Sequence, residues 1–200
     1  MRSEELLGTS KFFVIVLLAF TYLPTFLFAQ TNYQSSSANV TISGTSSLHD
    51  WTEKSAKGSA AATFVISSDH KITGLSALSF SVPAKSLKSE HSGMDNNTYK
   101  ALKTDKHANI TYTVSSATVE PVNANTFTIK TKGKLSIAGT IQETDVVGTA
   151  KLNGDRSITV TGSKKIKMTD YKVTPPTAML GTIKTGNDLT ISYDLKLTSK

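Results

Sequence analysis

The 200-residue sequence contains no cysteine, and this absence excludes several kinds of structure and chemistry. Without cysteine the chain can form no disulfide, offer no thiolate to a metal ion and use no thiol as a nucleophile. Any fold that it adopts must therefore be held together by side-chain packing and hydrogen bonds alone.

Sequence patterns typical of catalytic and metal sites are missing as well. The four histidines, His49, His70, His91 and His107, form no short-spaced ligand pair such as His-x-x-x-His. There is no Gly-x-Ser-x-Gly nucleophile motif and no glycine-rich phosphate loop before a helix. We therefore predict a protein that is not an enzyme and that holds no metal ion and no resident cofactor.

One long apolar run is present, and it lies near the N-terminus. Residues 12–29 are almost continuously apolar and follow two basic residues. A charged segment, an apolar run and a small residue such as Ala29 form the layout of a secretory signal peptide. An uncleaved anchor helix is the alternative, because a membrane span needs roughly 18 apolar residues, but Pro24 interrupts the run. We predict that residues 1–29 are a signal peptide and that the protein is periplasmic or secreted.

The rest of the chain has the length of one domain with a sizeable core. The formal net charge is +7, and the lysines are spread along the chain. This charge keeps a surface soluble, and it also favours transient contact with an anionic membrane surface. No basic run is longer than Lys164-Lys165, which argues against nucleic acid as a partner. Residues 30–37 are rich in Ser, Gln and Asn and are predicted to be a flexible segment before a folded domain at residues 38–200.

Alternation of apolar and polar residues predicts β-strands through most of this domain. The clearest case is the C-terminal segment, where apolar residues occupy every second position, namely Leu189, Ile191, Tyr193, Leu195 and Leu197. Turn-forming residues separate the runs, at 68–70, 120–123, 153–155 and 184–188. Strands of even length between such turns indicate either a β-sandwich or an up-and-down barrel.

One segment departs from the strand pattern and is predicted to be a helix over residues 94–103. Four of its residues lie roughly on one side of that helix: Met94, Thr98, Ala101 and Leu102. Ser92 or Asp95 is the expected N-cap. Between two strands, a helix of this length could cover one end of a barrel.

Several stretches of the sequence resemble a known family in both content and order. They are Ser-Leu-His-Asp-Trp-Thr at residues 47–52, the strand and loop at 78–89, the Lys-His-Ala-Asn-Ile-Thr-Tyr stretch at 106–112, and the segments at 133–140 and 167–171. Together they resemble the YceI-like family over about residues 38–198. Ala108 replaces a proline that is usual in the family, which is a local departure.

The resemblance implies an exported, eight-stranded, antiparallel lipocalin-like β-barrel with a short helix between strands. It also implies that the barrel binds a polyisoprenoid or a similarly long amphiphilic lipid. An eight-stranded barrel can hold one slim ligand, and such cavities are mostly apolar with a few polar groups that fix the ligand's orientation. We therefore predict an exported lipid carrier. The alternative is a non-catalytic structural or interaction barrel whose own side chains fill the interior.

The apolar faces of the strands must be buried, and the closed interior of a barrel is the natural place for them. The predicted ligand-lining residues are therefore Val40, Ile42, Ala62, Phe64, Ile66, Leu78, Phe80, Val82, Tyr112, Phe127, Ile129, Val160, Ile191 and Tyr193. Filling a solid core is the competing interpretation for each of them.

A few polar residues near strand ends and near the helix are candidates for binding the head group of a lipid. His49 and Trp51 lie at the end of a strand, and Lys88 and His107 flank the helical segment. A cation there could pair with a pyrophosphate or a quinone oxygen. Simple solvation is the alternative for the lysine, and a buried structural hydrogen bond is the alternative for each histidine.

Overall fold

The computed structural model describes residues 29–200. The predicted signal peptide therefore lies outside the described residues, apart from Ala29, which begins the first strand. The strands are β1 (Ala29–Ser46), β2 (Trp51–Ser55), β3 (Ser59–Ile66), β4 (Ile72–Pro83), β5 (Asn109–Pro121), β6 (Thr126–Ile137), β7 (Thr140–Leu152), β8 (Ile158–Lys167), β9 (Thr177–Ala178) and β10 (Ile183–Ser199). The helices are α1 (Ser92–Ala101) and the short 3-10 turns η1 (Ala84–Ser86), η2 (Met168–Tyr171) and η3 (Met179–Gly181).

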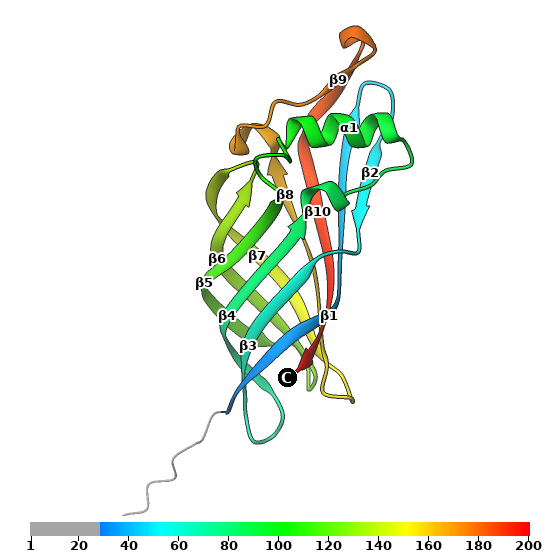
Figure 1. The fold of residues 1–200 in the computed structure, drawn as a ribbon. Coiled ribbons are helices and arrows are strands. Elements are labelled where there is room, and N and C mark those ends of the chain that lie inside the picture. Colours follow the sequence, from blue (N-terminus) through cyan, green and yellow to red (C-terminus); the bar gives the residue numbers. More distant parts are fainter. Residues whose placement is uncertain (1–28) are drawn as a thin grey trace, which may run out of the picture.

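The sheet closes on itself because the first long strand pairs with the last. β1 and β10 run antiparallel, from the pair Tyr33 and Ser199 to the pair Ser46 and Thr185. On its other edge β1 pairs first with β3 and then with β2, so these two short strands share one place in the wall. Neighbouring strands follow in order from β3 to β8 and then β10 (Figure 1). The prediction of a closed, eight-stranded antiparallel barrel is confirmed.

The prediction of a flexible segment at residues 30–37 was wrong, because these residues form the first half of β1. Backbone pairing with β3 and β10 holds both edges of this stretch. Tyr33 is only 5% exposed, and its ring meets the Phe64 ring edge-on with 5.5 Å between the centroids. The polar residues that suggested flexibility instead cover the solvent face of a strand whose other face is buried.

The alternation predicted from the sequence sets which side chains point into the barrel. In β6 every second residue from Phe127 to Ile137 is buried, and in β10 the buried Leu195 and Leu197 flank the exposed Lys196. The end of the barrel away from α1 is filled by a packed cluster, here called the lower core, that includes Tyr33, Phe64, Phe127, Ile158 and Leu197. A second cluster lines the barrel toward α1.

Helix α1 lies across the other end of the barrel, here called the mouth end (Figure 1). The predicted helix is confirmed, although it begins and ends two residues earlier than expected. The predicted cap was wrong: His91 is the N-cap and its side chain makes no capping hydrogen bond. Asp95 instead accepts hydrogen bonds from the preceding loop, because it is buried against that loop. Within residues 29–200, none of the helices has the length and hydrophobicity that a membrane span requires.

Candidate ligand-binding site

The mouth end of the barrel encloses a cavity of about 1030 Å³, here called the mouth chamber. Its wall carries apolar residues from several strands: Ile42, Ile110, Ile137, Ile166, Leu189 and Ile191. The residues predicted to share one side of the helix, Met94, Thr98, Ala101 and Leu102, all lie on this wall. The chamber therefore has the size and the apolar lining of a site for a small organic ligand, and α1 covers it.

A narrower cavity of about 120 Å³, here called the inner chamber, continues into the barrel. It shares Ile42, Ile110 and Ile191 with the mouth chamber, so the two cavities adjoin at these residues. Its wall is almost entirely aliphatic and aromatic. Beyond it lies the lower core, where side chains fill the barrel. The barrel is thus hollow at the mouth end, beneath α1, and filled by its own side chains at the other end.

Two tyrosines of the inner chamber present their rings while their hydroxyl groups are bound to the barrel wall. The Tyr112 hydroxyl lies 2.8 Å from Thr131 Oγ1, and the Tyr193 hydroxyl donates to the Val147 carbonyl at 3.1 Å. Burial raises the pKa of Tyr193 to about 12. A Cβ on Gly162 would clash with the Tyr193 hydroxyl, so glycine is needed at this position for the Tyr193 side chain to pack against strand β8. The deep part of the channel therefore offers apolar contact rather than free polar groups.

Most of the predicted lining residues lie on the wall of the inner chamber: Val40, Ile42, Phe64, Leu78, Phe80, Val82, Tyr112, Ile129, Val160, Ile191 and Tyr193. The remaining three lie elsewhere. Ala62 and Phe127 belong to the lower core, and Ile66 packs against it. The prediction did not include much of the mouth chamber, such as Leu87, Met168 and Val173, because these residues lie outside the alternating strands.

The structure separates the four predicted head-group residues. His49 and Trp51 line the mouth chamber, whereas Lys88 and His107 line neither chamber. The Trp51 indole N–H is already used, since it donates to the Thr45 carbonyl at 3.0 Å. The His107 ring packs against Gly139, so closely that a Cβ added to Gly139 would clash with the ring. This contact gives His107 a packing role.

Lys88 serves the wall of the site rather than its interior. Its ammonium group lies 3.2 Å from Asp95 Oδ2 and 5.1 Å from the centre of the Tyr99 ring. Backbone hydrogen bonds in both directions join Lys88 to Lys54 on β2, at 2.8 and 2.9 Å. These contacts fasten the loop before α1 to the edge of the barrel.

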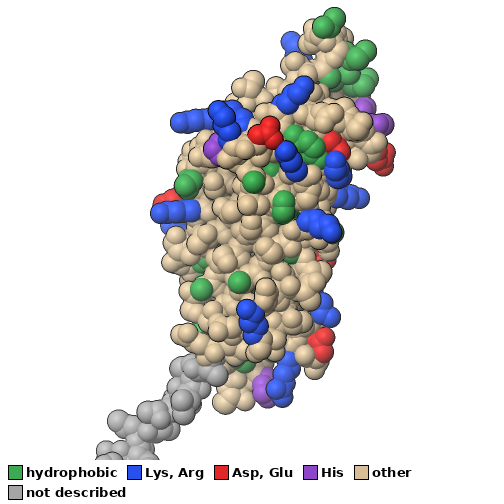
Figure 2. Space-filling model, in the orientation of Figure 1, with side chains coloured by type: hydrophobic (Ala, Val, Ile, Leu, Met, Phe, Trp, Pro, Cys, Tyr) green, Lys and Arg blue, Asp and Glu red, His purple; other side chains and the backbone are tan. Residues whose placement is uncertain are grey.

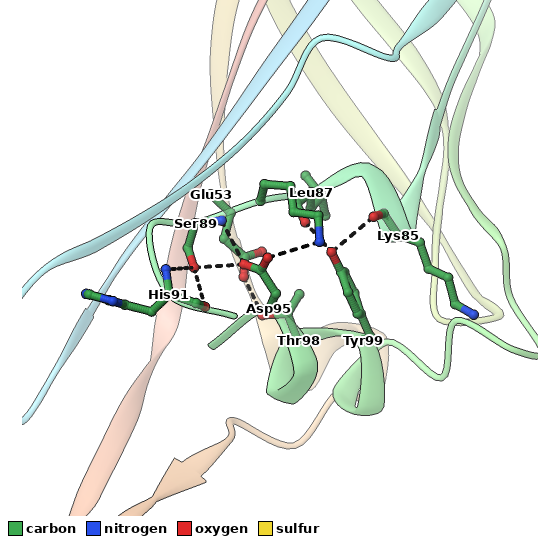
Figure 3. A network of polar contacts seen from close by, with 9 residues as sticks. Glu53, Lys85, Leu87, Ser89, His91, Asp95, Thr98 and Tyr99 are labelled. Atoms are coloured by element: carbon green, nitrogen blue, oxygen red, sulfur yellow. Dashed lines mark hydrogen bonds and ion pairs between the residues drawn. The ribbon is translucent and has the colours of Figure 1, made fainter. Parts of the chain in front are cut away.

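Helix α1 is held over the mouth chamber by its own polar side chains (Figure 3). Asp95 accepts from the backbone N–H and the hydroxyl of Ser89, both at 2.8 Å. Burial alone would raise the pKa of Asp95, but the Ser89 hydrogen bonds and the Lys88 ion pair outweigh it and hold that pKa below its ordinary value. The Tyr99 hydroxyl donates to the Leu87 carbonyl at 2.7 Å. The helix is therefore anchored at two points to one loop.

Glu53 is a functional candidate that the sequence reasoning missed. It lies on β2, is 1% exposed and lines the mouth chamber. The Thr98 hydroxyl on α1 donates to Glu53 Oε1 at 2.6 Å. Burial raises the pKa of Glu53 to about 7, while the Thr98 hydrogen bond opposes that rise. Glu53 lies two residues from both Trp51 and Ser55, so alternation puts it on the same face of the strand as these two. The strand is too short and polar to show an apolar stripe that would mark this face as the inner one.

Nothing in the described part of the chain resembles a metal centre. No three His, Asp or Glu side chains of residues 29–200 gather where they could hold a metal ion. What the site offers is a long apolar channel with one buried carboxyl near its opening, an arrangement that suits binding of an amphiphile.

Comparisons with known proteins agree with this description. The family model for the YceI-like domain matches residues 32–197. The crystal structure of Burkholderia cenocepacia BcnA is similar with a TM-score of 0.64 at 17% identity, over 80% of this chain and 96% of that one. A structure described as a polyisoprenoid binding domain from Saccharophagus degradans, implicated in plant cell wall breakdown, is similar with a TM-score of 0.65 at 12% identity, over 84% of this chain and 98% of that one. At these identities the likeness shows a shared fold. No curated protein matches this sequence.

Proposed function

The chain belongs to the YceI-like domain family, and from this premise we propose that it is an exported carrier that holds a long polyisoprenoid-type amphiphile inside its barrel. The observation that carries the proposal is the apolar channel formed by the mouth chamber and the inner chamber. Burial of a hydrocarbon chain there would remove its apolar surface from water, at roughly 25 cal/mol for each Å².

The choice of ligand class has two supports. The channel is elongated, because two adjoining chambers lie along the barrel, and its deep part is almost free of polar groups. The Saccharophagus degradans domain, which shares this fold, is itself described as binding a polyisoprenoid. Export to the periplasm or beyond is supported by the signal-peptide pattern of the sequence.

A closed structural barrel is the competing function, and the cavity argues against it. The lower core shows that this sequence can fill a barrel with its own side chains. It does not do so at the mouth end, where about 1030 Å³ stays free. We propose no catalytic step, since the sequence has no nucleophile motif and no cofactor-binding motif.

The experiment that tests the carrier function is native mass spectrometry of the purified protein, followed by solvent extraction of any bound lipid. We expect a long-chain lipid to copurify. Ile110→Trp, which places a larger side chain where the two chambers meet, should lower the bound fraction severalfold. Ile141→Trp, at an exposed position, is the matched control and should keep the lipid.

Thermal unfolding of both variants shows whether the fold survives, since overpacking typically destabilises a core by about 1–3 kcal/mol. A wild-type protein that carries no lipid and takes up none from vesicles would contradict the carrier function and favour the structural barrel.

We also infer that the mouth end meets a membrane surface during uptake and release. Three exposed apolar side chains, Leu48, Met179 and Leu180, stand at this end and also line the mouth chamber; we call them the apolar rim. Leu48 and Met179 are 66% and 73% exposed, and Leu180 is fully exposed. Figure 2 shows hydrophobic side chains gathered at this apex. Exposed apolar clusters of this kind are typical of interaction surfaces.

The backbone of the apolar rim supports this inference. Met179 and Leu180 have φ angles of +51° and +56°, in the left-handed region that residues with large side chains rarely adopt. The tight turn therefore presents two apolar side chains to solvent in an unfavourable conformation, a pattern that clusters at functional sites. The net charge of +7 favours an anionic bilayer as the partner.

A further inference from the structure

We infer that Glu53 receives the polar end of the ligand and selects an amphiphile whose head is an uncharged hydrogen-bond donor, such as an alcohol, over one that ends in a phosphate. This inference rests on the proposed carrier function, because it concerns the head of the same ligand. It follows from the free oxygen of one buried carboxyl and from the absence of cations around it.

One oxygen of the Glu53 carboxyl is left for a ligand. Thr98 donates to Oε1 at 2.6 Å, and no group among the described residues donates to Oε2. In the described part of the chain, every side-chain nitrogen or oxygen that is fully buried has a hydrogen-bond partner. Oε2 therefore keeps access to free space, and the space beside Glu53 is the mouth chamber. An ionised carboxyl of this kind accepts a strong hydrogen bond from a hydroxyl donor.

The charges around the chamber disfavour a phosphate. Among the described residues that line the mouth chamber there is no lysine and no arginine. Lys88 acts electrostatically on the Glu53 carboxyl from outside the chamber wall, and its ammonium group lies 3.2 Å from Asp95 Oδ2. Asp95, behind the wall, adds a second negative charge that acts on Glu53. A phosphate entering the chamber would therefore meet the Glu53 carboxyl with no cation on the wall to offset it.

The other polar groups of the chamber do not change this balance. Asn97 and Tyr171 are uncharged, and His49 and His91 stand at exposed positions on the wall. The inner chamber has Lys164 on its wall, but its ammonium group donates to the Asp145 carbonyl at 2.7 Å. Burial raises the pKa of Glu53 to about 7, so about half of the molecules carry a negative charge on this carboxyl at neutral pH.

The position of Glu53 also suits a head group. It lies beside α1, and the Thr98 hydroxyl of that helix donates to its carboxyl (Figure 3). A ligand whose chain extends from the inner chamber through the mouth chamber would bring its polar end near this carboxyl. Trp51, two residues earlier on the same strand, lines the same chamber and is the only tryptophan of the sequence.

The experiment compares two ligands that differ only in the head group, geranylgeraniol and geranylgeranyl phosphate. Each is titrated into the delipidated full-length protein at pH 7.5, with quenching of Trp51 fluorescence as the readout. We expect the wild type to bind the alcohol roughly tenfold more tightly, because placing like charges together disfavours the phosphate. Glu53→Gln keeps an acceptor but removes the charge, so the preference should fall severalfold. Glu143→Gln, on the exposed outer face, is the control and should keep it.

The wild-type ratio alone tests the inference, so it stays testable if the Glu53→Gln variant does not fold. Equal binding of the two ligands by the wild type, or an unchanged ratio in Glu53→Gln, would overturn the role of Glu53 and leave the carrier function intact. If neither ligand binds and no lipid copurifies, the carrier function itself fails, and the inference falls with it.

Discussion

Glu53 is the residue whose chemistry differs most from its surroundings, and it should make the stability of the barrel depend on pH. Burial raises its pKa from 4.5 to about 7. Between these two values the folded state keeps a proton that the unfolded state has lost, so stability falls as the pH rises through this window and levels off above pH 7.

We expect Glu53→Gln to be more stable than the wild type at pH 8, by about 2–3 kcal/mol. The difference should be small at pH 4.5, where the carboxyl is protonated in the folded state and about half protonated in the unfolded state. Urea unfolding at the two pH values measures the two free energies. A stabilisation that is the same at both pH values would show that the ionisation of Glu53 is not its cause.

Inward-facing residues differ in a way that the sequence does not predict. Period-two alternation correctly predicts which side chains of a strand point inward, as for Tyr112 and Ile191. Alternation says nothing of the height of a residue along the barrel axis, because that depends on register and tilt. Phe64 and Phe127 show the same inward pattern, yet Phe64 reaches the channel and Phe127 lies entirely in the lower core. Only the closed barrel decides between lining and core.

The position of α1 could be predicted from the sequence, but the hydrogen bonds that hold it in place could not. Its inward side was evident from the spacing of Met94, Thr98 and Leu102, and the structure confirms it. Its attachment to the preceding loop could not be predicted, since the sequence suggested Ser92 or Asp95 as an N-cap. The loop residues that bind Asp95 come from an irregular segment, where no periodicity indicates the direction of a side chain.

We expect Asp95→Asn to loosen α1 over the mouth chamber and to destabilise the protein by about 1–3 kcal/mol at pH 7, because hydrogen bonds to a charged group weaken. The pKa of Asp95 is lowered, so its stabilisation is present at neutral pH and is lost as the pH falls through the folded-state pKa. Hydrogen exchange of the α1 amides, compared with those of β6, localises the effect. Unchanged protection of α1 would mean that Tyr99 holds the helix without Asp95.

The composition of the first half of β1 suggested a flexible segment, whereas these residues form a strand. Its Ser, Gln and Asn residues lie on the solvent side, while Tyr33 fastens the other side to Phe64. We expect Tyr33→Ala to destabilise the barrel by about 3 kcal/mol, as for other large aromatic side chains removed from a core. The neighbouring exposed Gln34→Ala is the control and should change the stability by no more than about 0.5 kcal/mol. Chemical denaturation of both variants is the measurement, and equal small effects would mean that this half of β1 is dispensable.

At the scale of the whole molecule, the apolar rim and the net charge of +7 should direct one end of the barrel toward membranes. We expect sedimentation with vesicles rich in phosphatidylglycerol to exceed sedimentation with phosphatidylcholine vesicles. Binding should fall as salt screens the charges. The double change Met179→Ser and Leu180→Ser should reduce binding severalfold.

The control for the apolar rim is a pair of exposed apolar residues outside it, Val122 and Ile141, which are as exposed as Leu48. Their change to serine should leave vesicle binding as it is. Equal losses in the two double variants would show that general surface hydrophobicity, and not the mouth end, drives the association.

Under the proposed carrier function, the filled lower core limits the length of chain that the barrel can hold. Phe64 belongs both to this cluster and to the wall of the inner chamber, so it marks where a hydrocarbon chain must stop. Chains shorter than the channel leave empty space, and chains longer than it must leave their surplus carbons outside the mouth, in water or in a bilayer. The barrel would then select lipids by chain length, whatever their head groups.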